Sequence, residues 1–496
     1  MSKRAAEDDD DEPQTLKSGE RPVADGGAED GEDFEDEFED EFESEDEILE
    51  AGVDGRPDEE REAEERAAGA MEVDQQTFIP GRHKLDPGQT LAPDLSTYEM
   101  LHTLEPTWPC LSFDIIKDNL GDNRKSYPAT VYAVAGTQAA QGRERENQIM
   151  VMKLSGLSRN DKATTALDSD SDSDDDDEES ADSILETKSI PLTSTTNRIR
   201  AHQSPPSSSS TPPTTLTASM QESGDVLIHD ISPHLLAFDT PGYQLPPNAT
   251  KPLSTIRAHK RNEGYALAWS PLIPNGKLLT GDNTGSIFAT TRTEGGGFAT
   301  DTNPFTGHTS SVEDLAWSPT ERNVFASASA DGTVKIWDAR SKSRSPAISV
   351  QVSTSDANVL SWSTQTAHLL ASGHDDGTWS VWDLRQWKSS DTAAQSKPVA
   401  HFNFHLGQIT SLEWHPTDDS IVSVCSADNT LTLWDLAVEL DDEESKYTAD
   451  VNDVPPQLLF VHYMEDVKEA HWHPQIPGAV MATGNGGFGV FKTISV

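Results

Sequence analysis

The 496-residue chain carries 86 Asp and Glu residues against 37 Lys and Arg, a net charge of −49. This excess argues against direct nucleic-acid binding, which needs cations for phosphate, and favours a basic partner. The N-terminal stretch lacks the apolar centre of a secretory signal, and no apolar run is long enough to span a membrane. Because Cys110 and Cys425 are the only cysteines, we expect a reducing compartment and neither a disulfide framework nor a four-cysteine zinc site.

Most of the negative charge lies in two segments. Residues 1–80 contain 32 acidic and 7 basic residues, and residues 168–186 contain 11 acidic residues and no basic one. Both have too little apolar area to fold alone, which predicts a disordered acidic tail over 1–80 and a disordered acidic insert over 158–195. In the tail, Phe34, Phe38 and Phe42 recur every fourth residue. They would form one apolar stripe on a helix that folds on a basic partner; a purely solubilising tail is the alternative.

A helix is predicted over residues 93–105, within a lead-in segment that spans 81–128. Asp94 can cap its first turn, and four apolar side chains follow at intervals of three residues. The stretch Trp108–Phe113 then predicts the entry into a strand. The four apolar positions are Leu95, Tyr98, Leu101 and Leu104.

From about residue 255 the chain repeats itself, with a tryptophan every 45–58 residues. Each repeat has a turn residue, Asp or Asn, six positions before a second aromatic residue, which predicts four short strands per unit. A single four-stranded sheet cannot bury both faces, but radial stacking of such sheets can. A degenerate unit at 196–232, paired strands at 130–138 and 147–156 and the C-terminal strand complete a seven-bladed propeller over 129–496. The repeat tryptophans are Trp269, Trp317, Trp362, Trp414 and Trp472.

These repeats resemble the WD40 repeat, an all-β unit. In that family a loop histidine, a strand Ser or Thr, a turn aspartate and a tryptophan form a buried hydrogen-bond network. The resemblance implies a structural role, in place of a catalytic or metal-binding one, for four residues of the best-matching unit. These are His308, Ser327, Asp331 and Trp337.

A narrower resemblance rests on the predicted helix, Trp108–Phe113 and an acidic Pro-Pro loop over 438–456 before the last blade. This layout resembles the histone-binding WD40 proteins of chromatin-assembly complexes. The stretches GHTSSVEDLAWSPTE, SGHDDGTWSVWDLRQ and FKTISV are similar to the glutamate-rich WD-repeat proteins, which include the fungal regulator of ribosome biosynthesis. That resemblance implies a chaperone of the nucleus and nucleolus, and also of the cytoplasm if capture is co-translational. It would bind the newly made third protein of the large ribosomal subunit, a basic protein, and deliver it to pre-60S particles.

Two surfaces compete as the binding site. Tyr265, Glu313 and Asn358 lie four residues before their repeat tryptophans, which predicts equivalent positions on the rim of the central channel. We favour this rim for a ribosomal client, because function tends to lie on loops. A side groove is the alternative, and the one we expect histones to use. It would be formed by Leu95, Tyr98 and Leu101 opposite Asp441, Asp442, Glu443 and Glu444.

Other functions have less support in the sequence. The segments Trp337–Arg340 and Trp382–Arg385 match the Trp-Asp-x-Arg motif of propellers that dock on cullin adaptors, so a ubiquitin-ligase substrate receptor is a second alternative. No phosphate-binding loop or nucleophile-elbow motif is present, and we expect no enzyme activity and no cofactor. His471, His473 and Glu469 lie close in sequence, but the repeat itself accounts for Trp472-His-Pro, so we expect no metal site. We expect a monomer.

Overall fold

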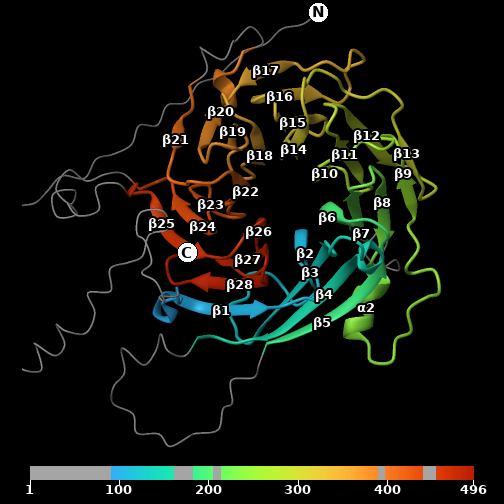
Figure 1. Ribbon diagram of the computed structural model, residues 1–496, viewed down its shortest axis with the longest axis vertical. Coiled ribbons are helices and arrows are strands. Elements are labelled where there is room, and N and C mark those ends of the chain that lie inside the picture. The colour runs from blue at the N-terminus through green and yellow to red at the C-terminus, as the bar shows by residue number, and fades with distance from the viewer. Residues whose placement is uncertain (1–90, 161–182, 205–213, 389–396, 439–453) are drawn as a thin grey trace, which may run out of the picture. The chain divides into compact units, whose positions relative to one another are not determined.

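The computed structural model describes residues 91–160, 183–204, 214–388, 397–438 and 454–496. These residues form seven four-stranded antiparallel sheets arranged around a central opening (Figure 1). The predicted all-β, seven-bladed WD40 propeller is therefore confirmed. Phe34, Phe38, Phe42 and the loop acids Asp441, Asp442, Glu443 and Glu444 lie outside the described residues. No described helix is long and apolar enough to cross a membrane.

Each blade orders its strands from the channel outward. Blade 1 contains β2 (Cys110–Ile116), β3 (Ala129–Thr137), β4 (Gln148–Leu157) and β5 (Ile184–Pro191). Blade 2 contains β6 (Thr196–Ser204), β7 (Thr214–Gln221), β8 (Val226–Asp230) and β9 (Ser254–Ile256), with the helix α2 (Ser232–Asp239) between its last two strands. Blade 3 contains β10 (Ala266–Trp269), β11 (Lys277–Gly281), β12 (Ile287–Arg292) and β13 (Phe298–Thr300).

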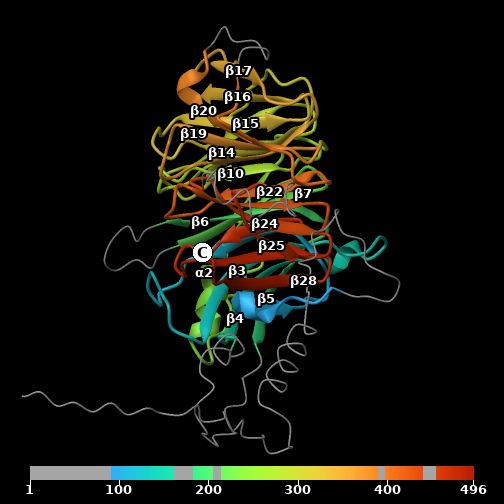
Figure 2. The same cartoon turned by 90° about the vertical axis from the view of Figure 1, so that its left-hand side faces the viewer.

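The remaining blades follow the same order. Blade 4 contains β14 (Val312–Trp317), β15 (Val324–Ser329), β16 (Thr333–Asp338) and β17 (Ile348–Gln351), which Figure 2 shows in succession. Blade 5 contains β18 (Ala357–Trp362), β19 (Leu369–His374), β20 (Trp379–Asp383) and β21 (Ala400–Phe402). Blade 6 contains β22 (Ile409–Trp414), β23 (Ile421–Ser426), β24 (Thr430–Asp435) and β25 (Leu458–Tyr463). Blade 7 contains β26 (Glu469–Trp472), β27 (Ala479–Gly484), β28 (Gly487–Thr493) and, outermost, β1 (Tyr98–Leu104).

The first strand in the chain closes the ring and corrects the predicted helix at 93–105. Only η1 (Leu95–Thr97) is helical, a single 3-10 turn that Asp94 caps. Residues 98–104 form β1, which pairs antiparallel with β28, so the last blade combines the two ends of the propeller. Tyr98, Met100 and Leu104 point inward at even spacing, as in a strand with one buried face. Pairing with β28 therefore prevails over the three-residue spacing that favoured a helix.

Two expected boundaries also change. β1 and β2 are blade strands, so the propeller begins before residue 129 and the lead-in segment 81–128 is partly propeller. The insert over 158–195 ends earlier than predicted, because β5 pairs with β4 along its whole length as the outer strand of blade 1. The strand entry predicted at Trp108–Phe113 corresponds to β2.

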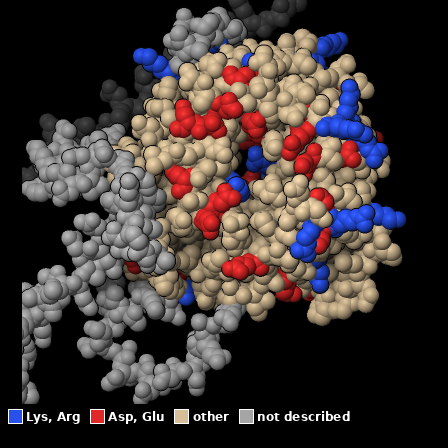
Figure 3. Space-filling model, in the orientation of Figure 1, with Lys and Arg blue, Asp and Glu red and all other residues tan. Residues whose placement is uncertain are grey.

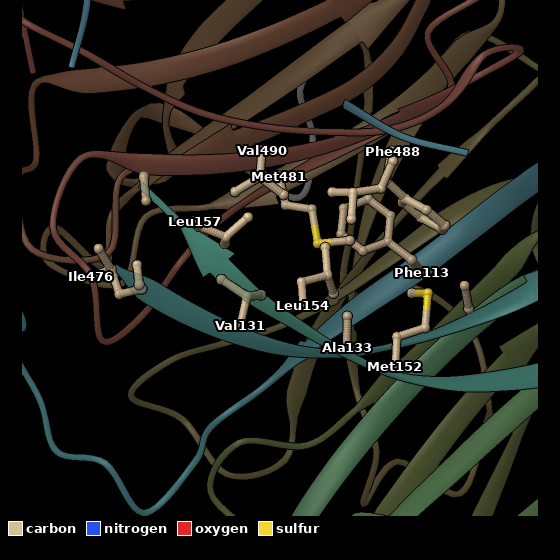
Figure 4. Packing of buried hydrophobic residues seen from close by; sticks show 14 of the residues in the cluster. Phe113, Val131, Ala133, Met152, Leu154, Leu157, Ile476, Met481, Phe488 and Val490 are labelled. Carbon is tan, nitrogen blue, oxygen red and sulfur yellow. The ribbon is translucent and has the colours of Figure 1, made fainter. Parts of the chain in front are cut away.

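Apolar side chains fill the spaces between neighbouring blades. The cluster between blades 7 and 1 joins Phe113, Met152, Met481, Phe488 and Val490 (Figure 4). Its members come from both ends of the chain, so closure of the ring and formation of this cluster depend on each other.

Candidate functional site

The repeat network defines one face of the propeller. His308, in the loop before β14, bonds through Nδ1 to Asp331 Oδ2 at 2.9 Å, and Asp331 lies in the turn between β15 and β16. Ser327 Oγ lies 2.7 Å from His308 Nε2 and accepts the Trp337 indole N–H at 2.7 Å. The structure thus brings all four residues together. The loops that enter the innermost strands and the turns between second and third strands therefore share one face, which we call the top face.

Hydrogen bonding inside the network favours the ionised aspartate. Burial alone would raise the pKa of Asp331, but hydrogen bonds from His308, Thr333 and the Thr309 amide hold it well below its usual range. Blade 6 repeats the arrangement with His405, Asp428 and Trp434. In blade 5, His374 from β19 takes the place of the missing loop histidine and contacts the serine that Trp382 donates to. The network ties loop to strand and leaves its polar atoms engaged, which suits a structural role.

The three predicted rim residues occupy one equivalent position. Glu313 and Asn358 are the bulged residues at the start of β14 and β18, and Tyr265 immediately precedes β10. Tyr265 is 37% exposed, and its hydroxyl donates to Glu263 Oε1 at 2.9 Å. Asn197 donates to the same oxygen at 2.8 Å. These contacts hold the rim side chains at the entrance of the channel.

Acidic groups dominate the electrostatics of this rim. Burial raises the pKa of Glu313, and the like charges of Asp356 and Asp314 add to the rise. Burial, the hydrogen bond to Glu263 and the charge of Glu313 raise the pKa of Tyr265 to about 12. Both shifts indicate a locally negative potential, which attracts a cationic ligand.

A buried ion network lies inside the channel, and sequence reasoning did not predict it. Glu469 of β26 is 1% exposed and accepts hydrogen bonds from the guanidiniums of Arg198, at 2.8 Å, and Arg200. It also accepts the Phe113 amide at 2.9 Å. Figure 3 shows basic side chains within the central opening and acidic side chains around it. These contacts link blades 1, 2 and 7 at the axis.

Further ionisable groups extend the network around the channel. Asp114 accepts the Ala201 amide at 2.7 Å and Asp314 the Leu360 amide at 2.9 Å. Burial raises the pKa of both carboxyls. The pKa of Glu469 lies well below its usual range, because the attraction of Arg200 and Arg198 outweighs burial. The network therefore stores fixed charge below the rim in a site shielded from water.

His471 gives this network a measurable pH dependence. Its Nδ1 lies 2.9 Å from Glu413 Oε2, and its Nε2 lies 3.6 Å from Glu469 Oε1. Burial alone would lower the pKa of His471, but these carboxylates raise it to about 10. Folding therefore favours the protonated ring, and this stabilisation is complete below the ordinary value of 6.5 and lost as pH rises toward about 10.

We expect the free energy of unfolding to fall between pH 6.5 and 10 by an amount on the order of 2 kcal/mol from this residue. His471→Asn removes the titrating ring and should flatten the curve across that window. Urea unfolding at several pH values measures the difference. Parallel curves for the two proteins would show that His471 is not protonated by its neighbours.

The structure does not form the predicted side groove from its apolar members. Tyr98 is 4% exposed, its hydroxyl lies 2.8 Å from His462 Nδ1, and its ring meets Phe460 edge-on at 5.2 Å. Leu101 packs partly buried against the same cluster, and Leu95 is half-buried in η1. The expectation that Tyr98 offers its side chain to a partner is wrong, because that side chain fills the space between blades 6 and 7.

The two Trp-Asp-x-Arg arginines are exposed on neighbouring blades. Arg340 and Arg385 each fold back onto the aspartate two residues earlier in a two-point ion pair, with NH2–Oδ2 distances of 2.8 and 2.7 Å. Their side chains are 70% and 67% exposed. They are accessible, but no described contact between them forms a joint site. The part of the chain that the structure describes also holds no group of three or more His, Cys, Asp or Glu placed to bind a metal ion.

Comparison with known proteins agrees with this architecture. The WD domain, G-beta repeat, matches residues 300–338 and 396–435, and the family described as histone-binding protein RBBP4 or the equivalent component of the CAF1 complex matches residues 88–158. The chain is 45% identical to ribosome assembly protein rrb1 of Schizosaccharomyces pombe over the full length of both. It is 41% identical to protein HEAT STRESS TOLERANT DWD 1 of Arabidopsis thaliana, covering 88% of this chain and 95% of that one.

A third relative gives the same result. Glutamate-rich WD repeat-containing protein 1 of Dictyostelium discoideum is 40% identical, over 83% of this chain and 84% of its own. Identity at this level over most of each chain fits the shared repeats and the ring closure described above. The chain belongs to the glutamate-rich WD-repeat family, together with ribosome assembly protein rrb1.

Proposed function

We propose that the protein is a ribosome assembly factor that acts as the dedicated chaperone of one basic ribosomal protein, the newly made third protein of the large subunit. The observation that carries this proposal is the 45% identity to a ribosome assembly protein along the whole chain. Such a client, unassembled, would bind nucleic acid indiscriminately, so its chaperone has to compete with negative charge.

The top face suits such a client. Its rim holds Glu263, Glu313 and Asp356 around the channel entrance, and Tyr265 adds an exposed aromatic surface among them. The acidic residues steer a basic chain over a Debye length of roughly 8 Å at physiological ionic strength. Release can follow when ribosomal RNA competes for the client, and this mechanism needs neither ATP nor catalysis. The nucleus and nucleolus are the compartments that this role implies, with the cytoplasm for co-translational capture.

Charge reversal on the rim tests the proposal. Glu313→Lys together with Asp356→Lys should weaken client binding at least tenfold at physiological salt, because close like charges at an interface are repulsive. The matched control is Glu294→Lys with Glu321→Lys, two exposed acidic residues in the strand connections at the opposite face. Pull-down and titration calorimetry with the purified ribosomal protein measure both. Equal affinity for the two variants would remove the top face as the binding site.

The identity of the client is tested separately. Affinity purification of the full chain at moderate salt, followed by mass spectrometry, should recover one stoichiometric basic ribosomal protein. The same experiment with residues 1–80 deleted shows how much the acidic tail contributes to capture. Recovery of a cullin adaptor would contradict the chaperone proposal.

A histone-binding chaperone is the second candidate, because the histone-binding family matches residues 88–158. Those residues supply β1 to β4, which is the outer strand of blade 7 and most of blade 1. A test of the side surface has to change Leu95, since Tyr98 is buried. Recovery of a broad set of histones, lost on Leu95→Glu and kept in the rim variant, would favour this candidate.

A further inference from the structure

A polar groove lies between the outer parts of blades 2 and 3, away from the channel. Its volume is about 600 Å³, and β9, β12, β13 and the loop before β10 line it. Hydroxyl groups are frequent along its walls, which carry Ser254, Thr255, Thr284, Ser286, Thr300 and Thr302. The groove therefore offers many hydrogen-bonding groups with little apolar surface.

The charges that face the groove are unequally engaged. Asp282 is 1% exposed and bonds to His259 and Thr284, and Asp301 pairs with Arg344 at 2.7 Å. Both acidic residues of the lining are thus already occupied.

The two cations of the lining are far less engaged. The Arg257 side chain is 76% exposed and lies 3.8 Å from its nearest carboxylate, on Asp225. Lys260 is exposed and has no ion pair among the described residues. Lys260 also adopts a left-handed backbone conformation, with φ of 62°, which a residue with a side chain adopts only at a cost. The loop therefore presents a free ammonium group at this position on a strongly acidic protein.

The groove also lies beside strand edges. β9 and β13 are the last strands of their sheets, so the outer edge of each is unpaired within the described residues. An unpaired edge offers backbone donors and acceptors to an added strand. A segment with an extended backbone could hydrogen-bond to this edge and to the hydroxyls, while its carboxylates or phosphates reach Arg257 and Lys260.

We propose that this groove, defined by Arg257, Lys260 and the edges of β9 and β13, binds an extended acidic peptide segment of a protein partner. This site takes a ligand of opposite charge to the client of the top face, so it lies outside the proposed function. A peptide fits better than RNA, because the aromatic rings of the lining are not free to stack on bases. Phe288 is 9% exposed and packs on His259, and Phe298 packs on Trp269.

A labelled peptide tests the groove in the full chain. The probe is a fluorescein-labelled peptide of alternating Glu and Ser, about ten residues long, which spans roughly 33 Å as a strand. A second probe carries phosphoserine at each Ser and distinguishes carboxylate from phosphate recognition. Fluorescence anisotropy at low salt should show saturable binding that weakens at least tenfold in the variant Arg257→Glu with Lys260→Glu.

The controls separate the groove from general electrostatics. Lys342→Glu with Arg145→Glu changes net charge equally at exposed positions outside the groove, and affinity should stay within about twofold of wild type. Lys260→Gly keeps the left-handed loop without the charge, so weaker binding by this variant at an unchanged melting temperature supports the proposal. Equal binding by groove and control variants would overturn it, as would no saturable binding. Groove-dependent binding of a single-stranded polyuridine probe that is tighter than peptide binding would also overturn it.

Discussion

Glu469→Ala should destabilise the propeller by about 3–5 kcal/mol, because it leaves two buried guanidiniums without their carboxylate. Arg198 and Arg200 both donate to Glu469, and their side chains are only 15% and 21% exposed. The substitution also removes the acceptor of the Phe113 amide, which joins blade 7 to blade 1. Urea unfolding, followed by tryptophan fluorescence, measures the change in free energy.

The pH dependence of the same group gives a second readout. Because folding lowers the pKa of Glu469, its contribution to stability is complete above the ordinary value of 4.5 and is lost as pH falls toward the folded pKa. The alanine variant should therefore lose less stability than wild type as pH falls below that value. Asp466→Ala is the matched control, since that carboxylate pairs with Lys468 on the surface and is 52% exposed. A loss of under about 1 kcal/mol in Glu469→Ala would show that the two arginines are solvated without Glu469.

The propeller could be predicted from sequence because each repeat states its own pattern. Turn aspartates, repeat tryptophans and alternating apolar residues recur within about fifty residues, so local structure and its stacking both follow from a short window. The network of His308, Ser327, Asp331 and Trp337 is contained in one such window, and it involves only β15, β16 and the loop before β14.

The channel network was missed because no single repeat contains it. Arg198 and Arg200 precede Glu469 by about 270 residues, and only the register of the innermost strands brings them together. A signal did exist, since strands that line a narrow channel seldom carry charge unless it is paired. Aligning the repeats at their bulges places Asp314 and Glu469 in one equivalent position, three residues before the repeat tryptophan.

The first strand was missed for a related reason. Residues 98–104 satisfy both a loose helical spacing and a strand alternation, so the local pattern leaves the choice open. Pairing of Leu101 with Phe491 and of Leu104 with Phe488 decides it, and both partners lie almost 400 residues later in the chain. Contacts between the two ends of a ring are not visible in any local window.

Tyr98→Ala should destabilise the protein by about 3–5 kcal/mol, the range for removing a buried aromatic ring. Tyr98 is 4% exposed and packs against Phe460, His462 and Phe491, which belong to blades 6 and 7. The lost ring leaves a cavity where β1 closes the circle, so opening of that blade becomes easier. Hydrogen exchange of the β1 and β28 amides should rise together with the loss of stability in urea.

Matched variants separate packing from the polar contact and from partner binding. Tyr98→Phe keeps the ring and removes only the hydroxyl that meets His462, so we expect a loss of about 1–2 kcal/mol. Thr103→Ala, at an exposed position of the same strand, should change stability by less than about 0.5 kcal/mol. If Tyr98→Ala were as stable as Thr103→Ala, β1 would not be required for closure. If it is unstable as expected, loss of a bound partner in this variant reports an opened ring, and only a partly exposed residue such as Leu95 can report on the side surface itself.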